Sequence, residues 1–375
     1  MVKKAQIQAI KSETEDSYSD DSLFNISSWG ADLSFRELIS RYEEDELVKP
    51  ELQRNYIWDK TEASRFIDSL LLGLPVPSIF LAKTENEKML IVDGYQRIMT
   101  VHDFTRGIFS LDGKVFKLSN SDKINIRWRG KAFSELSAAE QRKIRNTTIH
   151  SIIFVQEVPE GGQTSLFQVF ERINTSGRSL MAQEIRNCVY QGRFNMLLFE
   201  LNEYPAWRKL FGSEVPEPRM RDMEFILRFF ALQPDVINSI NSERLSLKKH
   251  LNLFMKKNKD LEEQQAEEYA ELFKATIEKI SDFWGESAFH NLSPTKKGVL
   301  VRKFSPTIFD SISIATSVAM STESIDQIDN AEEKRRELLS DPDYRFAIMQ
   351  ETMRIASIKT RTRKAMNYLY GIRDE

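Results

Sequence analysis

One short segment limits the fold of this chain more than any other: Asp93-Gly94-Tyr95-Gln96-Arg97. The mainly apolar runs 89–92 and 98–101 flank it. Because Asp-Gly favours a tight turn, the pattern predicts a buried strand, a sharp turn and the first turn of a helix. Such a junction directs backbone N–H groups and the Arg97 guanidinium towards one point, which suits a phosphate group.

Composition places the chain among soluble globular proteins. Its 375 residues suffice for two or three domains, and 41% of them are apolar and 29% charged. No stretch approaches the roughly 18–20 apolar residues of a membrane helix, and the first residues lack the apolar core of a signal peptide. Cys188 is the single cysteine, which excludes an internal disulfide and a cysteine-based zinc site. We therefore expect a cytoplasmic protein with no membrane partner.

Charge is unevenly distributed along the chain, although the net charge is only −3. Residues 12–21 are rich in serine and carry acidic but no basic side chains, which predicts a disordered acidic tail over residues 1–23. Residues 351–373 are basic and nominate Arg361, Arg363 and Lys364 as contacts to nucleic-acid phosphates. The alternative interpretation is a solvated helix face, which is the usual role of a charge run.

The first half of the chain mixes predicted strands with predicted helices. Apolar residues recur at helical spacing after Ser34 and after Asp59, both of which suit a helix N-cap. Short apolar runs at 78–82 and 89–92 predict a hairpin, and β-branched residues over 147–158 predict a further strand.

Beyond Gly192 almost every segment has a helical pattern. The expected helices cover about 194–211, 219–232, 243–257, 260–285, 305–320 and 342–370. We therefore expect an α+β domain over residues 24–190, followed by a mainly α-helical domain over residues 191–375.

Three polar clusters interrupt the apolar patterns of the first domain. They are Gln53-Arg54, the Asp93–Arg97 segment, and the segment 172–178, which contains Asn174 and Arg178. Taken singly, each has an ordinary interpretation, as a surface strand, a turn stabilised by an ion pair, and a connector between helices.

Taken together, the clusters have the chemistry of a triphosphate site. Arg54 and Arg97 could hold phosphate oxygens in a bidentate manner, and Gln53 and Asn174 could add hydrogen bonds. Asp93 could hold Mg²⁺ or orient Arg97. By spacing alone this remains one hypothesis beside the ordinary interpretations.

At these residues the chain resembles a known family. Pro50-Glu51-Leu52-Gln53-Arg54-Asn55-Tyr56-Ile57-Trp58 is similar to the Pro-x-x-Gln-Arg-x-Tyr-Val-Trp opening of the N-terminal domain of GmrSD-type restriction systems. The family motif Asp-Gly-Gln-Gln-Arg is similar to the segment 93–97. Further similar blocks are Phe66–Leu70, Gly73–Pro77, Phe170–Asn174 and Arg221–Arg228.

The resemblance implies a ParB/sulfiredoxin-like fold with a small mixed sheet. It also implies a nucleotidase site, because family members include nucleotide-hydrolysing subunits of modification-dependent restriction systems and sensors of phosphorothioated DNA in anti-phage defence. Carried over, the motif nominates Asp93, Gln96 and Arg97 as catalytic residues. It nominates the following as binding residues: Gly94, Tyr95, Gln53, Arg54, Asn174 and Arg178. The expected cofactors are a nucleoside triphosphate and Mg²⁺, with Asp93 as the metal ligand.

Two departures from the family pattern concern chemistry. Tyr95 replaces the first Gln of the motif and could stack on a base or pack in the core. The histidines His102, His150, His250 and His290 form no nuclease pattern that we recognise. We therefore expect any DNA cleavage to need a partner nuclease chain or an unrecognised site.

Three functional hypotheses follow from the sequence. The first is an NTP-hydrolysing protein of a DNA-directed defence or restriction system, with Mg²⁺-dependent hydrolysis at the Arg97 turn. The second is a non-catalytic module in which bound nucleotide controls DNA binding. The third is an interaction or inhibitory partner of an effector nuclease.

Overall fold

A computed structural model describes residues 5–10, 26–48, 58–83, 88–156, 181–296, 298–322 and 328–372. The chain divides into two compact units. One, which we call the sheet unit, comprises residues 21–180 and 187–189, and the other, the helical unit, comprises residues 1–20, 181–186 and 190–375.

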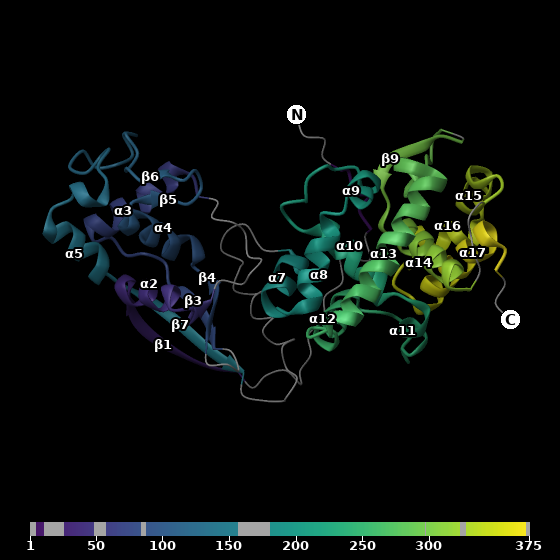
Figure 1. The fold of residues 1–375 in the computed structure, drawn as a ribbon, viewed down its shortest axis with the longest axis horizontal. Coiled ribbons are helices and arrows are strands. Elements are labelled where there is room, and N and C mark those ends of the chain that lie inside the picture. Colours follow the sequence, from purple (N-terminus) through teal and green to yellow (C-terminus); the bar gives the residue numbers. More distant parts are fainter. Residues whose placement is uncertain are drawn as a thin grey trace. The chain divides into compact units, whose positions relative to one another are not determined.

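The sheet unit is built around a five-stranded mixed sheet with the strand order β1-β7-β3-β4-β2 (Figure 1). The outer pair β1·β7 and the hairpin β3·β4 are antiparallel, whereas β3·β7 and β2·β4 are parallel. The strands are β1 (Ile26–Ser34), β2 (Leu47–Val48), β3 (Ile79–Lys83), β4 (Met89–Asp93) and β7 (Thr148–Gln156). The predicted hairpin is therefore confirmed, and its second strand ends at Asp93.

Four helices pack on the sheet and enclose one hydrophobic core. They are α2 (Phe35–Glu43), α3 (Lys60–Leu72), α4 (Tyr95–Arg106) and α5 (Ala138–Asn146). Buried residues of all four join Ile79, Leu81 and Ile91 from the central strands in the same cluster. A small hairpin, β5 (Ile108–Phe109) with β6 (Lys114–Val115), and the short 3₁₀ helix η2 (Phe133–Glu135) follow α4.

Local capping explains where these helices begin and end. Ser34 accepts a hydrogen bond from Glu37 N at 3.2 Å, and Asp59 forms a capping box with Glu62. Gly73 ends α3 with a left-handed backbone at φ 78°. The helices predicted after Ser34 and Asp59 are therefore confirmed, and local hydrogen bonds explain where they begin.

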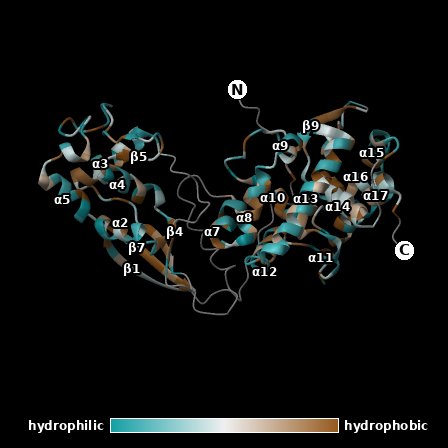
Figure 2. Cartoon of the chain, in the orientation of Figure 1, coloured by the Kyte–Doolittle hydropathy of each residue, from teal (hydrophilic) through white to brown (hydrophobic). Residues whose placement is uncertain are grey.

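From Ala182 onward the described residues form eleven α-helices, all in the helical unit except the end of α7, whose residues 187–189 belong to the sheet unit. They are α7 (Ala182–Val189), α8 (Arg193–Asn202), α9 (Pro205–Phe211), α10 (Arg221–Ala231), α11 (Pro234–Asn238), α12 (Leu247–Lys257), α13 (Glu263–Trp284), α14 (Pro306–Thr322), α15 (Ala331–Ser340), α16 (Pro342–Met349) and α17 (Ile355–Tyr370). A turn η3 (Gly285–Ser287) and a hairpin of β8 (His290–Leu292) and β9 (Leu300–Phe304) lie between α13 and α14. Most helices carry hydrophilic and hydrophobic residues on different sides (Figure 2), as helices that pack by one face do.

Two segments that were each expected to form one helix form two helices instead. The segment expected as 194–211 is divided at Pro205, which starts α9 because proline suits the first turn of a helix and not its interior. The segment expected as 342–370 is divided between Met349 and Ile355, where Glu351 has φ 46°. Helix α15 and the hairpin β8–β9 have no counterpart in the predictions.

The expectation of a disordered tail is wrong for residues 5–10. Gln8 N donates to Phe304 O and Phe304 N donates to Gln6 O, both at 2.8 Å, so this segment lies alongside β9. Ile10 is buried. The acidic stretch 12–21 lies outside the described residues.

The predicted fold class is confirmed: the chain is α+β, with a small mixed sheet in its N-terminal part and a mainly helical C-terminal part. Within the described ranges, none of the helices has the length and hydropathy needed to cross a membrane.

Candidate functional site

Gly94 makes the turn between β4 and α4 possible. Its backbone has φ 105° and ψ 2°, a left-handed conformation that residues with a side chain rarely adopt. A Cβ at this position would lie 2.8 Å from Ile79 Cβ, and closer still to the Cγ2 methyl group of the same residue. The register of β3·β4 is irregular between Phe80 and Leu81, opposite Asp93. The chain enters α4 at this point because β4 ends, the strand register is irregular and Gly94 adopts a left-handed backbone.

Asp93 and Arg97 face each other across this turn. The Arg97 guanidinium donates to Asp93 Oδ2, and the two residues are one helical turn apart. The Arg97 side chain is 12% exposed and that of Asp93 is 40% exposed, so the pair lies at the surface of the site with the cation further inside. Arg97 Nε is buried and has no hydrogen-bond partner within the described parts of the chain.

Gln96 links the start of α4 to the segment that enters α3. Its Oε1 accepts a hydrogen bond from Trp58 N at 3.2 Å. The Trp58 ring packs edge-on against Phe66 of α3, with ring centroids 5.7 Å apart. In this structure, therefore, the Gln96 side chain positions a neighbouring segment through its amide oxygen.

Tyr95 belongs to the hydrophobic core. Its side chain is buried and lies in the cluster formed by α2, α3, α4 and the central strands. Of the two alternatives for Tyr95, the structure therefore favours packing in the core over stacking on a base, because the side chain is buried. The core position also explains how an aromatic residue fits into the motif without disturbing the turn.

The junction has the physical properties of an anion site. The first turn of a helix has backbone N–H groups that no earlier carbonyl of the helix can accept, and it carries a partial positive charge. No side chain in the described part of the molecule caps the α4 N-terminus at Gly94. The Arg97 guanidinium adds a full charge beside it. This end of α4 can therefore attract a phosphate, and the Asp93 carboxylate would compete with that phosphate for Arg97.

Asp93 is the one carboxylate within the segment 93–97 that could hold a magnesium ion. Among the described residues, no group of three or more His, Cys, Asp or Glu side chains could hold a metal ion. Mg²⁺ is commonly bound by one or two carboxylates together with phosphate oxygens and water. The half-exposed Asp93 carboxylate fits such a role only together with a bound phosphate.

The remaining predicted nucleotide contacts lie outside the described residues. Gln53 and Arg54 fall in the range 49–57, and Asn174 and Arg178 fall in the range 157–180. Their participation in the site stays a prediction.

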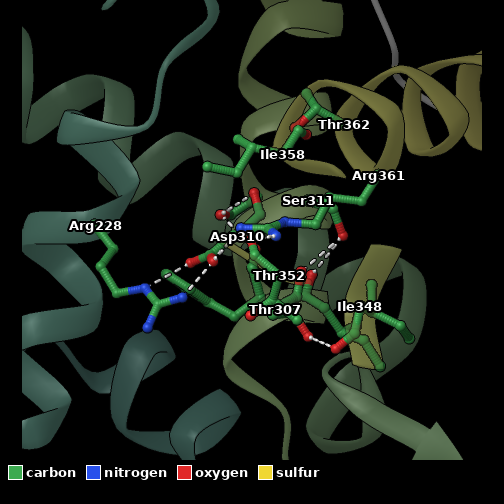
Figure 3. Close-up of polar contacts among 12 residues, drawn as sticks. Arg228, Thr307, Asp310, Ser311, Ile348, Thr352, Ile358, Arg361 and Thr362 are labelled. Atoms are coloured by element: carbon green, nitrogen blue, oxygen red, sulfur yellow. Dashed lines mark hydrogen bonds and ion pairs between the residues drawn. The ribbon is translucent and has the colours of Figure 1, made fainter. Parts of the chain in front are cut away.

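The three basic residues predicted to contact nucleic acid have different environments on α17. Arg361 is fully buried, donates to Thr352 O at 2.6 Å and pairs with Asp310 at 3.2 Å, as Figure 3 shows. Arg361 is therefore a core residue, and its expected contact with DNA is wrong. Lys364 pairs with Asp341 at 2.8 Å and with Asp343 at 3.0 Å. Arg363 is exposed.

Residues 35–191 match a family model described as the N-terminal domain of GmrSD restriction endonuclease. The match covers most of the described sheet unit and includes Asp93, Gly94 and Arg97. The predicted resemblance is therefore confirmed, and this part of the chain is similar to a restriction-system domain. Comparisons with curated proteins and with solved structures gave no match.

Proposed function

We propose that the chain binds a nucleoside triphosphate at the start of α4 and acts in a DNA-directed defence system, either modification-dependent restriction or another anti-phage response. The observation that carries the proposal is the junction itself, where Gly94 opens α4 beside the Arg97 guanidinium. The similarity of residues 35–191 to a restriction endonuclease domain supports the biological setting.

In this proposal Arg97 holds the phosphate oxygens and the α4 N-terminus adds its partial positive charge. The Arg97 guanidinium is already directed towards the turn by Asp93, so little side-chain entropy is lost when a phosphate binds. Asp93, once its contact with Arg97 is released, would be the residue that holds Mg²⁺ or orients the attacking water. Mg²⁺, when bound, would neutralise charge on the phosphates during hydrolysis.

A second candidate function is nucleotide binding without hydrolysis, in which the nucleotide controls DNA binding. The observation in its favour is that the one carboxylate at the described site is engaged with Arg97. A site for hydrolysis needs a group that orients water or metal, whereas a binding site needs only Arg97 and the helix end. A measurement of phosphate release distinguishes the two functions.

Calorimetric titration with ATP, GTP, CTP and UTP, each with and without Mg²⁺, tests both functions. We expect one triphosphate to bind, and Arg97→Ala to weaken it about tenfold or more because a charged hydrogen bond is lost. The control is Arg106→Ala, which removes a 62% exposed arginine from the other end of the same helix. Equal affinity of the wild type and Arg97→Ala would reject the site.

Phosphate release then distinguishes the enzyme from the binding module. Mg²⁺-dependent release that disappears in Arg97→Ala and remains in Arg106→Ala supports hydrolysis at this turn. Tight binding without release supports the module. If nucleotide binds without phosphate release, the affinity of the protein for DNA should differ between its nucleotide-bound and nucleotide-free forms.

DNA and a nuclease chain are the proposed macromolecular partners. The name of the matched family is the support for both. Phosphate contacts to DNA would make the logarithm of the affinity fall steeply with the logarithm of the salt concentration. A flat dependence, with and without nucleotide, would argue for a protein partner alone.

A further inference from the structure

The helical unit contains a pocket of about 720 Å³, and no residue of the proposed nucleotide site lines it. Its walls come from the two residues that follow α10, the short helix α11, Leu272 of α13, one face of α14 and one face of α17. This volume lies within the range of small-molecule sites, roughly 300–1,000 Å³, and sites between helices are common in helical proteins.

The floor of the pocket is apolar. Leu232, Ile237, Ile358 and Met366 line it, and all four are buried side chains. An apolar group that entered the pocket would leave water and contact these side chains, which is favourable in proportion to the area removed from water. The floor therefore suits a ring system or another apolar body.

Three polar side chains that line the pocket form hydrogen bonds within the protein. Gln233 Nε2 donates to Phe229 O at 3.0 Å, and the Ser317 and Thr362 hydroxyls donate to carbonyls of their own helices at 2.9 and 3.1 Å. These groups add no charge to the floor and need no ligand to compensate them. Charge is consequently confined to the rim of the pocket.

Two cationic side chains of α17 lie at this rim. Lys359 and Arg363 are one helical turn apart, line the pocket and are exposed. Within the described ranges neither has an ion pair, in contrast to Arg361 and Lys364 on the same helix, which are held by Asp310 and by Asp341 and Asp343. Asp235 is the one acidic residue among those that line the pocket, so the lining carries an excess of positive charge.

We propose that this pocket binds a small amphipathic organic anion. Its apolar body would lie among Leu232, Ile237 and Ile358, and its single phosphate, sulfonate or carboxylate group would lie between Lys359 and Arg363. An extended nucleic-acid backbone fits less well, because it would place polar sugars against the apolar floor and would need a stripe of cations instead of one pair.

The test uses the full chain and two fluorescent probes with similar ring systems. 8-Anilinonaphthalene-1-sulfonate carries one negative charge, whereas N-phenyl-1-naphthylamine carries none. We expect saturable binding of the sulfonate at one site per chain. Removing both cations, in Lys359→Ala with Arg363→Ala, should weaken the sulfonate about tenfold or more and leave the neutral probe within about twofold.

Two further variants make the test specific. Ala356→Trp, an exposed lining position, should obstruct the pocket and reduce the affinity for both probes. Arg345→Ala, an exposed arginine of α16 that does not line the pocket, should change neither affinity. Circular dichroism melting of each variant verifies that the helical unit is folded.

Three results would overturn the proposal. The first is sulfonate binding that is the same in the wild type and the double variant. The second is binding of either probe that is unaffected by Ala356→Trp. The third is a double variant that loses affinity for duplex DNA while sulfonate binding is unchanged, because the two cations would then belong to a nucleic-acid surface.

Discussion

The Arg97 guanidinium donates to the carboxylate of Asp93, the residue on the other side of the glycine turn that starts α4. Asp93 is the last residue of β4 and precedes the first turn of α4, so its negative charge lies near the positive end of the helix. The pair keeps the guanidinium at the turn, where a phosphate would need it. The same pair also means that any phosphate must displace a carboxylate.

Replacing Asp93 with Asn should therefore separate binding from hydrolysis. Without Mg²⁺, we expect the triphosphate to bind about 2- to 5-fold more tightly, because a partly exposed competing charge is removed. Phosphate release should be lost if Asp93 orients water or metal. Calorimetry without Mg²⁺ and a phosphate assay with Mg²⁺ measure the two effects. Weaker binding in the absence of Mg²⁺ would contradict competition between the carboxylate and the phosphate.

Gly94→Ala should destabilise the sheet unit strongly. The left-handed backbone costs about 1–2 kcal/mol for a residue with a Cβ, and the clash with Ile79 adds about 1–3 kcal/mol. Gly107→Ala is the matched control, since Gly107 has φ 81° and its Cβ would meet nothing within 4 Å. The difference in the free energy of unfolding between the two variants, measured in urea, isolates the clash. Equal losses would show that Ile79 moves aside.

Asp310→Asn should be among the most damaging changes in the helical unit. Arg228 of α10 and Arg361 of α17 both donate to this carboxylate, and all three side chains are at most 1% exposed. Removal of the charge takes the Asp310 carboxylate away from two buried guanidinium groups, at a cost of about 3–5 kcal/mol. Figure 3 shows how the carboxylate lies between the two arginines.

The control for Asp310 is Asp343→Asn, which removes a 74% exposed partner of Lys364. Exposed pairs contribute about 0–1 kcal/mol. The loss in the free energy of unfolding, measured by heat and by urea, should therefore be clearly larger for Asp310→Asn than for Asp343→Asn. Loss of the same size in the two variants would mean that the buried carboxylate carries no special role.

The stability of the helical unit should decrease in mild acid because of His250. Burial lowers the pKa of His250 below its usual value of 6.5, and the hydrogen bond of Nε2 to Ala231 O, 2.6 Å long, offsets this only in part. The unfolded chain then binds a proton more readily than the folded chain, so the free energy of unfolding falls as the pH drops below 6.5.

His250→Gln tests this dependence, because an amide can still donate to Ala231 O and does not titrate. Urea midpoints from pH 7.5 to pH 5 should fall less in the variant than in the wild type. Parallel curves for the two proteins would remove His250 as the cause.

Elements determined by local chemistry were predictable from the sequence. The helices after Ser34 and Asp59, and the strand–turn–helix at Gly94, follow from caps, a turn dipeptide and apolar spacing. The missed elements depend on distant partners. Residues 5–10 are ordered by hydrogen bonds to Phe304, which no local pattern indicates.

The candidate site shows the same division. The positions of Asp93 and Arg97 were predictable because both lie within one turn of the chain. The burial of Tyr95 was not, because it depends on side chains from three other helices and the sheet. The pocket in the helical unit has no local signal at all, since α11, α13, α14 and α17 each contribute part of its wall.

By itself the sequence determined the order of the two parts, the resemblance to a restriction-system domain and the glycine turn with its flanking charges. Only the tertiary structure decided what each charge does. Arg361, Arg363 and Lys364 are nearly adjacent in sequence, yet Arg361 is in the core, Arg363 lines a pocket and Lys364 is paired with Asp341 and Asp343. The reason is physical: each residue turns the side chain by about 100° around a helix, so neighbours face different surroundings.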